Sequence, residues 1–515
     1  MKKKKICFLV LLLFIILNLI SETNIYAKSL DKISGVFDKI DFSTYSDDEL
    51  FDLLSNWNKF PKLDDSTGFR QMKNMINDTL SAPFIFYIPD NYDEQLKTPL
   101  LLYLHGGVGR QDFIEDFRDY AVENPFLPFA EQNNWFILFP AGNQYTMWWE
   151  SVGIENIKTQ IRYLKNQYNI DDDRIFVTGF SDGGSGSFHL ALSDPTYFAS
   201  FYPLNGFISV GSRVTKKPAY LPNLKNRFTA AINTDEDSLY PAAEMRQLME
   251  LAQLADADLS YKEYWGIGHS FDYADKEIPL IIENMKLHPR NIFKNDIYWE
   301  TDGSEYYTCD WLEILELDTL ETQQKWQQKL NLKMENKRIQ FGFYDDRKFK
   351  GKGIKVRDIV EGSTSDSMHL LKDDIIIKMD GTPVDSISVL LDLRASKKRG
   401  DKVSLTVLRN NDEIKLNGQF PEIEFYDAFI LNRPSGAVKA KYFGNQFEIE
   451  TSRIKEIAIL IHPDMVNLEN PVIININGKE RFNQKVSINR KFMIDNFRKN
   501  RDRKAIWIKK LSFQI

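Results

Sequence analysis

The stretch Gly179-Phe180-Ser181-Asp182-Gly183-Gly184 follows directly on the apolar run Arg174-Ile175-Phe176-Val177-Thr178. This order predicts a buried strand that ends in a G-x-S-x-G turn and leads into a helix. Such a turn exposes the Ser181 hydroxyl above a helix N-terminus, which suits a nucleophile. The pattern makes hydrolysis the first hypothesis. It also requires a base, an orienting acid and donors for the oxyanion elsewhere in the chain.

A second glycine-rich turn lies about 75 residues before the serine, where His105-Gly106-Gly107 ends the apolar run Leu100–Leu104. Glycine lets a backbone turn tightly and approach a ligand closely. We therefore expect the backbone N–H groups of Gly107 and of Asp182, the residue after the serine, to form the oxyanion hole. Without the serine turn, His105-Gly106-Gly107 would be an ordinary turn at the end of a strand.

The base and the acid are found by elimination among few candidates. Of six histidines, only His269 lies on a glycine-flanked loop between a predicted strand and a predicted helix after the serine. The acid is expected in the exit loop of the intervening strand 227–233, where Asp237 is favoured and Asp235 is the alternative. The chain order Ser181, Asp237, His269 then matches a Ser-Asp-His triad.

Aromatic side chains follow the predicted strand 135–139 on the side where the site is expected. Tyr145, Trp148 and Trp149 are therefore candidates for the substrate pocket, since aromatic rings pack well against acyl or sugar groups. Ordinary core packing is the alternative interpretation.

The first 27 residues have the pattern of a signal peptide. Lysines 2–5 are basic, residues 6–20 are almost wholly apolar, and Ala27 is a small residue at the cleavage position. An apolar core of about 15 residues is short for a membrane span and typical of a secretory signal. An uncleaved anchor is the alternative. Cleavage would leave Cys309 as the only cysteine, and export without an intrachain disulfide favours a bacterial periplasmic or secreted protein.

Composition restricts the partners. The 515 residues are 43% hydrophobic, enough for several domains with sizeable cores. Cleavage after residue 27 removes four lysines and one glutamate, which moves the formal net charge from −7 to −10. So acidic a chain is not expected to bind nucleic acid, and no stable membrane span is expected in the mature chain. No metal cluster or phosphate-binding loop is evident, so neither a metal nor a cofactor is predicted.

The order of elements predicts an α/β fold. Residues 28–80 carry helical patterns and are expected to form a helical lead-in, whereas residues 81–289 alternate strands and helices. That alternation is typical of a doubly wound parallel sheet flanked by helices. The segment Tyr168–Gly184, with its acidic residues and Arg174 before the strand, resembles α/β-hydrolase esterases of the polyhydroxybutyrate depolymerase and feruloyl esterase-like group. The resemblance implies hydrolysis of a carboxylic ester by Ser181, Asp237 and His269.

Residues 337–421 resemble a bacterial PDZ domain. Gly353-Ile354-Lys355-Val356, Asp373-Asp374-Ile375-Ile376 and Lys378-Met379-Asp380-Gly381 carry the likeness, with Asp373 where the family commonly has glycine. The resemblance implies that a peptide adds a strand between Phe341-Gly342-Phe343 and the helix predicted at 387–395. The backbone of that loop would hold the peptide's C-terminal carboxylate. A PDZ-like fold used only as a spacer is the alternative.

Strand patterns flank this domain on both sides. Residues 290–336 and 422–515 are expected to form one small β domain of antiparallel hairpins, interrupted by the PDZ domain, with Trp299 and Trp311 in its core. The basic stretch 479–510 is expected to be a solvated face. The sequence thus favours an exported serine esterase with a PDZ domain for peptides or partner proteins. A serine peptidase of prolyl-oligopeptidase type and a non-catalytic PDZ binding protein on a hydrolase scaffold are the alternatives.

Overall fold

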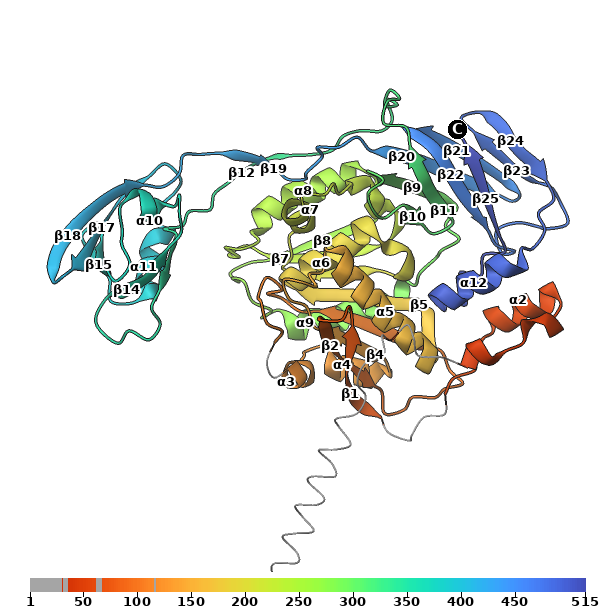
Figure 1. The fold of residues 1–515 in the computed structure, drawn as a ribbon, viewed down its shortest axis with the longest axis horizontal. Helices are drawn as coiled ribbons and strands as arrows, with labels where there is room; N and C mark the ends of the chain where they lie inside the picture. The colour runs from red at the N-terminus through yellow and green to blue at the C-terminus, as the bar shows by residue number, and fades with distance from the viewer. Residues whose placement is uncertain (1–29, 31–35, 62–66, 115–116) are drawn as a thin grey trace, which may run out of the picture. The chain divides into compact units, whose positions relative to one another are not determined.

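The computed structural model describes residues 30, 36–61, 67–114 and 117–515 (Figure 1). They form two compact units. Unit 1 comprises the described residues up to Leu330 together with Phe429–Ile515, and unit 2 comprises Asn331–Ala428. The predicted signal peptide, residues 1–27, lies outside the described residues. Within the described ranges, no helix is both long and apolar enough to cross a membrane.

Unit 1 contains an eight-stranded sheet in the order β1-β2-β4-β3-β5-β6-β7-β8. β1 and β2 pair antiparallel and β2 joins β4 antiparallel, while all pairs from β4 to β8 are parallel. The predicted doubly wound α/β fold is confirmed. The strands are β1 (Gly68–Met75), β2 (Ser81–Ile88), β3 (Thr98–Leu104), β4 (Phe136–Pro140), β5 (Ile170–Phe180), β6 (Phe201–Leu204), β7 (Thr229–Thr234) and β8 (Leu259–Tyr264).

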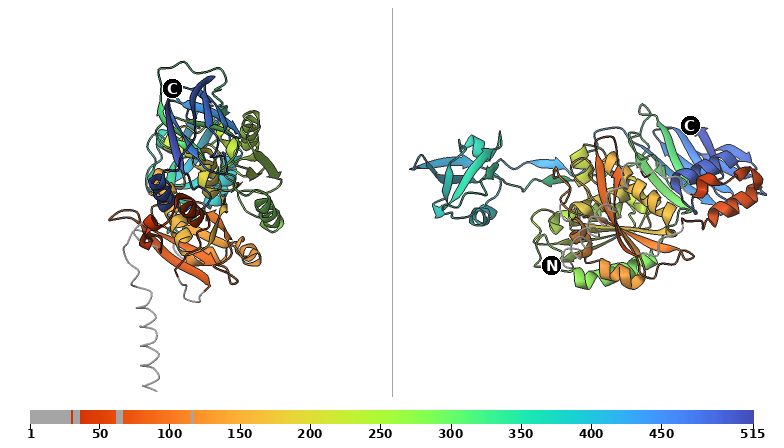
Figure 2. Two further views of the ribbon diagram at one scale, coloured as in Figure 1. Left: turned by 90° about the vertical axis from the view of Figure 1, so that its right-hand side faces the viewer. Right: turned by 60° about the horizontal axis from the view of Figure 1, so that its bottom comes forward.

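Helices fill the connections from β3 onward, because parallel neighbours need a crossover (Figures 1 and 2). α3, α4 and α9 share one apolar core with the sheet, which includes the buried strand residues Leu101 and Phe176. The helices are α3 (Phe117–Val122), α4 (Leu127–Asn133), α5 (Ser151–Gln167), α6 (Asp182–Ser193), α7 (Val210–Thr215), α8 (Ala242–Leu254) and α9 (Ala274–Leu287), with 3-10 turns at Pro195–Tyr197 and Leu221–Asn226.

The expected helical lead-in is only partly helical. Val36–Lys39 and Phe42–Thr44 form 3-10 turns and α2 spans Asp47–Ser55, with a capping box between Ser46 and Glu49. Residues 68–75 form the edge strand β1 instead of continuing the helical pattern. The sequence of β1 has little apolar alternation, so its strand state comes from pairing with the apolar strand β2.

Two further sheets form the predicted β domain. One has the order β10-β11-β22-β25 and the other β24-β23-β21-β20-β9, and Trp299 and Trp311 are fully buried in the shared core, as predicted. One expectation is wrong: β21 pairs β23 in parallel, because the long connection through β22 returns the chain in the same direction. The strands are β9 (Asp296–Thr301), β10 (Thr308–Cys309), β11 (Leu312–Leu317), β20 (Gly436–Phe443), β21 (Gln446–Ser452), β22 (Ile454–Ile461), β23 (Val472–Ile476), β24 (Lys479–Gln484) and β25 (Lys509–Gln514).

The two ends of the described chain meet in this β-domain core. Phe37, Leu50 and Trp57 from the N-terminal segment pack there with Phe497 of α12 (Arg490–Asn500) and with Trp507. Figures 1 and 2 show α2 beside α12. The lead-in therefore belongs structurally to the β domain.

Buried charges join the eight-stranded sheet to the C-terminal segment. Arg503 Nε lies 2.6 Å from Asp172 Oδ2, and Arg290 Nη1 lies 2.7 Å from Asp502 Oδ2. Lys165 adds a third cation near both aspartates. Since buried ions are tolerated only when paired, this network holds the two parts of unit 1 together. Arg503 belongs to the stretch that was expected to be solvated, so that expectation is wrong at this residue.

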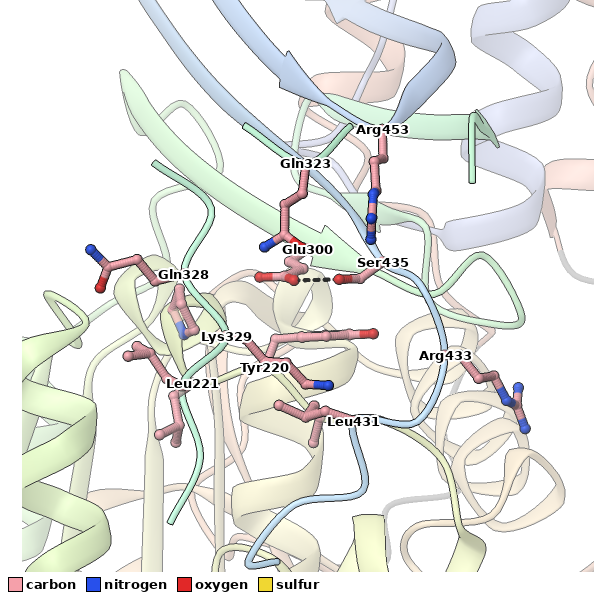
Figure 3. Close-up of a pocket in the computed structure, with 13 residues that line it drawn as sticks. Tyr220, Leu221, Glu300, Gln323, Gln328, Lys329, Leu431, Arg433, Ser435 and Arg453 are labelled. Atoms are coloured by element: carbon pink, nitrogen blue, oxygen red, sulfur yellow. Dashed lines mark hydrogen bonds between the residues drawn. The ribbon is translucent and has the colours of Figure 1, made fainter. Parts of the chain in front are cut away.

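A cavity of about 60 Å³ lies where the two connections to unit 2 leave unit 1 (Figure 3). The Glu300 carboxylate accepts hydrogen bonds from Gln327 Nε2 at 2.8 Å on one connection and from Ser435 Oγ at 2.6 Å on the other. Burial raises the pKa of Glu300. Both connections are thus fixed to β9 by one side chain, and none of the predicted catalytic residues lines this cavity.

Unit 2 holds the sheet β13-β14-β15-β17-β18, with α11 packed on it and a β12–β19 ribbon leading to and from unit 1. Its bounds, 331–428, are slightly wider than the expected 337–421. The elements are β12 (Lys333–Glu335), β13 (Phe343–Asp345), β14 (Ile354–Ile359), α10 (Thr364–Ser367), β15 (Ile375–Met379), β16 (Thr382–Pro383), α11 (Ile387–Ala395), β17 (Lys402–Arg409), β18 (Asp412–Gln419) and β19 (Phe425–Asp427).

Candidate active site

Ser181 sits on a strained turn between β5 and α6. Its backbone has φ 62° and ψ −122°, a conformation that non-glycine residues rarely adopt and that active sites often hold. Gly183 is required two residues later, since a Cβ there would lie 1.8 Å from the Leu104 carbonyl oxygen at the end of β3. This close approach of α6 to β3 brings the serine beside the loop that follows β3.

The structure brings Ser181, His269 and Asp237 into one hydrogen-bonded chain. His269 Nε2 lies 2.8 Å from Ser181 Oγ, and His269 Nδ1 lies 2.7 Å from Asp237 Oδ2. The three residues come from the loops after β5, β8 and β7, at the carboxyl edge of the parallel sheet where ligands bind in open α/β folds. With Nδ1–H donating to the carboxylate, Nε2 is free to accept the serine proton.

Asp237 is almost fully buried and well supplied with donors. Backbone N–H groups of Leu239 and Tyr240 donate to Oδ1 at 2.8 Å, and Asn205 Nδ2 donates to Oδ2 at 2.9 Å. Burial by itself raises the pKa of Asp237, but hydrogen bonds from His269, Asn205 and Tyr240 outweigh it and hold the pKa below its usual value. The carboxylate is therefore kept ionised beside the imidazole.

Asn205 and Tyr240 support the site without any motif that points to them. Asn205 follows β6 directly, so its only sequence signal is its place at the carboxyl end of a buried strand. Asp235, the alternative acid, does not contact His269. Its Oδ1 accepts the N–H of Gly266 at 2.7 Å and so shapes the loop that carries the histidine.

The loop Gly106-Gly107 lies against the serine. A Cβ on Gly106 would lie 3.0 Å from Ser181 Cβ, and Gly107 has φ 69°, which favours glycine. His105 holds the loop from beneath, with Nδ1 2.8 Å from Gly106 O and Nε2 accepting the Gly142 N–H at 2.8 Å. Burial lowers the pKa of His105 to about 4, so the ring is neutral and the Nδ1–H tautomer suits both partners.

The three aromatic candidates for the substrate pocket differ in their exposure to solvent. Tyr145 is 53% exposed, but Trp148 is fully buried and donates its indole N–H to His105 O at 2.9 Å. Trp149 is 3% exposed. Both tryptophans are core residues, so the alternative of core packing holds for them and the pocket prediction does not. Adjacent aromatic residues are common both in the core beneath a loop and in the wall of a pocket, and the sequence alone does not distinguish these two positions.

The predicted peptide-binding loop lies at a sheet edge of unit 2. Phe341 is buried in the unit 2 core, Gly342 has φ 82°, and Phe343 begins the edge strand β13. A Cβ on Gly342 would lie 2.2 Å from Ser363 Cβ, so this position requires glycine. On α11, Ile387 and Leu391 lie one turn apart and are each 41% exposed.

Comparison with known proteins matches both parts of the chain. Residues 141–290 match the dienelactone hydrolase family and residues 322–418 match the PDZ domain family. The bifunctional acetylxylan esterase/xylanase XynS20E of Neocallimastix patriciarum is 24% identical over 182 residues, which cover 31% of this chain and 26% of that protein. Acyl-protein thioesterase 1 of Candida albicans is 28% identical over 195 residues, 35% of this chain and 81% of that protein. This chain thus spans about a quarter of the first relative and most of the second.

Solved structures with a similar region include a thermostable esterase, at 22% identity and TM-score 0.36, which covers 43% of this chain and 64% of that one. The S-formylglutathione hydrolase FrmB of Staphylococcus aureus has 15% identity and TM-score 0.32, covering 44% and 99%. The family matches confirm the α/β-hydrolase and PDZ resemblances. The chain combines a region that matches the dienelactone hydrolase family with a region that matches the PDZ domain family.

Proposed function

We propose that the protein is a serine esterase that cleaves carboxylic esters through an acyl-enzyme on Ser181. The hydrogen-bonded chain from Asp237 through His269 to Ser181 carries the proposal, because nucleophile, base and orienting acid are within bonding distance before any substrate arrives. The matches to an esterase and a thioesterase favour an acyl group as the part transferred.

The steps follow from the residues present. His269 Nε2 takes the Ser181 proton as Oγ attacks the ester carbonyl carbon, and Asp237 stabilises the charged imidazole. The backbone N–H groups of Gly107 and Asp182 hold the oxyanion. The alcohol leaves with the proton from His269, and water activated by the same ring then releases the acid and restores the serine.

The test is turnover of p-nitrophenyl butyrate, a feruloyl ester, an acyl thioester and a peptide anilide by the purified chain. Ser181→Ala is expected to lower ester turnover by about 10⁴-fold or more. Ser187→Ala on α6 is the matched control, since its buried hydroxyl has no hydrogen-bond partner among the described residues. Ester turnover that survives Ser181→Ala refutes the mechanism, and anilide turnover above ester turnover would make the protein a peptidase.

We further propose that unit 2 binds the C-terminus of a peptide between β13 and α11. The free edge of β13 and the exposed Ile387 and Leu391 on α11 support this arrangement, which combines main-chain pairing with an apolar pocket. Fluorescence anisotropy with a library of C-terminal peptides tests it. Leu391→Glu should abolish binding and Leu371→Glu, exposed on a loop of the same unit, should not. Equal affinity for C-terminally amidated peptides would contradict carboxylate capture.

We also propose export to the bacterial periplasm or medium, on the pattern of residues 1–27 alone. Mass spectrometry of the protein from an expressing bacterium should show a mature N-terminus after Ala27. An intact N-terminus on cytoplasmic protein would refute cleavage and export.

A further inference from the structure

Asp182 has a side chain whose contacts the catalytic steps do not use. Its Oδ2 accepts the Val108 N–H at 3.0 Å, and its Oδ1 accepts the Tyr240 hydroxyl at 2.9 Å. Val108 follows the Gly106-Gly107 loop directly. A single carboxylate on the first residue of α6 therefore ties down the loop after β3 and the loop after β7.

The β3 loop needs such an anchor. Gly106 and Gly107 have the largest backbone freedom of any residue type, so holding them beside Ser181 costs conformational entropy. His105 fixes the start of the loop and the Val108 N–H fixes its end. Without the second attachment, the Gly107 N–H would sample positions away from the oxyanion.

Tyr240 links this anchor to the acid and the base. Its backbone N–H donates to Asp237 Oδ1 at 2.8 Å, and its ring meets the His269 ring edge-on with centroids 5.7 Å apart. The same ring also stacks on Phe207, with centroids 6.1 Å apart. Two ring contacts therefore orient the Tyr240 side chain whose hydroxyl donates to Asp182.

We propose that the Asp182 carboxylate and the Tyr240 hydroxyl are positioning groups that set the oxyanion hole by fixing the Gly106-Gly107 loop to the nucleophile helix. The inference rests on the proposed esterase function and adds residues that act through the backbone donors. An anchor that acts on the oxyanion donors stabilises the transition state more than the bound ester, so its loss should lower kcat and leave KM nearly unchanged.

The test compares Asp182→Ala, Asp182→Asn and Tyr240→Phe on p-nitrophenyl butyrate. Asp182→Ala should lower kcat by about 10- to 100-fold with KM within about 2-fold, and Tyr240→Phe by less. Asp182→Asn should recover most of the loss, because the amide oxygen accepts the Val108 N–H and the amide N–H donates to the tyrosine oxygen. The double variant Asp182→Ala/Tyr240→Phe should be no slower than Asp182→Ala alone.

A second readout is the affinity for phenylboronic acid, whose tetrahedral adduct with Ser181 places an oxygen in the oxyanion hole. That affinity should fall in parallel with kcat. Tyr261→Phe is the matched control, since it removes a hydroxyl that donates to Ala242 O and takes no part in the contacts of Asp182. If Asp182→Ala does not fold, Tyr240→Phe carries the test.

The inference is overturned by a rise in KM with unchanged kcat, by an Asp182→Asn variant as slow as Asp182→Ala, or by an unchanged boronic acid affinity. Ser181→Ala separates the two proposals. If that variant keeps its activity, the esterase mechanism fails; if it is inactive while Asp182→Ala and Tyr240→Phe are fully active, only the positioning role fails.

Discussion

Acidification should destabilise unit 1 through buried histidines, and His189 on α6 gives the cleanest case. The side chain is 5% exposed, and burial lowers the pKa of His189 from 6.5 to about 4. The folded protein keeps this ring neutral down to about pH 4, whereas the unfolded chain binds a proton once the pH falls below 6.5. Acid therefore favours the unfolded state between these two values.

The magnitude follows from the shift. At pH 5 the His189 ring is almost fully protonated in the unfolded chain and almost neutral in the folded protein. This pH lies 1.5 units below 6.5, the pKa of the ring in the unfolded chain. At about 1.4 kcal/mol per unit, His189 lowers the free energy of unfolding by about 2 kcal/mol relative to pH 7. His105 and His462, each with a pKa of about 4, act in the same direction.

Urea unfolding followed by tryptophan fluorescence measures this effect in unit 1 alone, since all nine tryptophans lie there. Between pH 7 and pH 5, His189→Gln should lose about 2 kcal/mol less stability than the unsubstituted chain. The comparison cancels groups that act oppositely, such as Glu300, whose pKa is raised by burial. Equal losses in both proteins would mean that His189 is protonated in the folded state, and the reasoning would fail.

Three further predictions concern packing and charge. Asp502→Ala removes a buried carboxylate shared by Arg290 and Lys165 and should lower the free energy of unfolding of unit 1 by about 3–5 kcal/mol in urea, whereas Asp495→Ala on the exposed face of α12 should cost under about 1 kcal/mol. Gly183→Ala should yield little soluble, active protein because its Cβ would meet a strand carbonyl, while Gly109→Ala, with open space around it, should express normally; equal yields would refute the close contact. Gly342→Ala should abolish peptide binding by unit 2 in the anisotropy assay, and an unchanged affinity would contradict the proposed loop geometry.

Local signals were sufficient to predict that Ser181, Asp237 and His269 meet at one edge of the sheet. Each of the three residues lies in the loop after a strand that the sequence predicts: Ser181 after β5, Asp237 after β7 and His269 after β8. Because the carboxyl ends of parallel strands meet at one edge of a sheet, the order of the strands brings the three residues to that edge. Asn205 and Tyr240 carry no such signal, because their roles depend on side-chain directions that only the packed loops define.

The errors share a physical cause. Trp148 and Trp149 are pocket candidates by their place after the strand 135–139, and the structure favours the alternative of core packing, because their burial depends on the direction in which the loop turns. Strand β1 becomes a strand by pairing with the apolar strand β2 that follows it, and β21 pairs with β23 across the intervening strand β22; the residues of β1 and β21 do not by themselves encode these pairings. Arg503 looks like any surface arginine until Asp172, more than 300 residues earlier, is placed beside it.

The core shared by both ends of the chain has a consequence for biosynthesis. Phe37, Leu50 and Trp57 leave the ribosome first, yet the strands and helix that cover them lie near residue 500. At about 5–20 residues per second, roughly 20 to 90 s separate the synthesis of Trp57 from that of Trp507. These apolar side chains lack their C-terminal partners throughout that interval, so a newly made chain is expected to depend on holding factors or rapid completion to avoid aggregation. The β domain can fold only after translation is nearly finished, whereas the hydrolase sheet between its two halves can begin earlier.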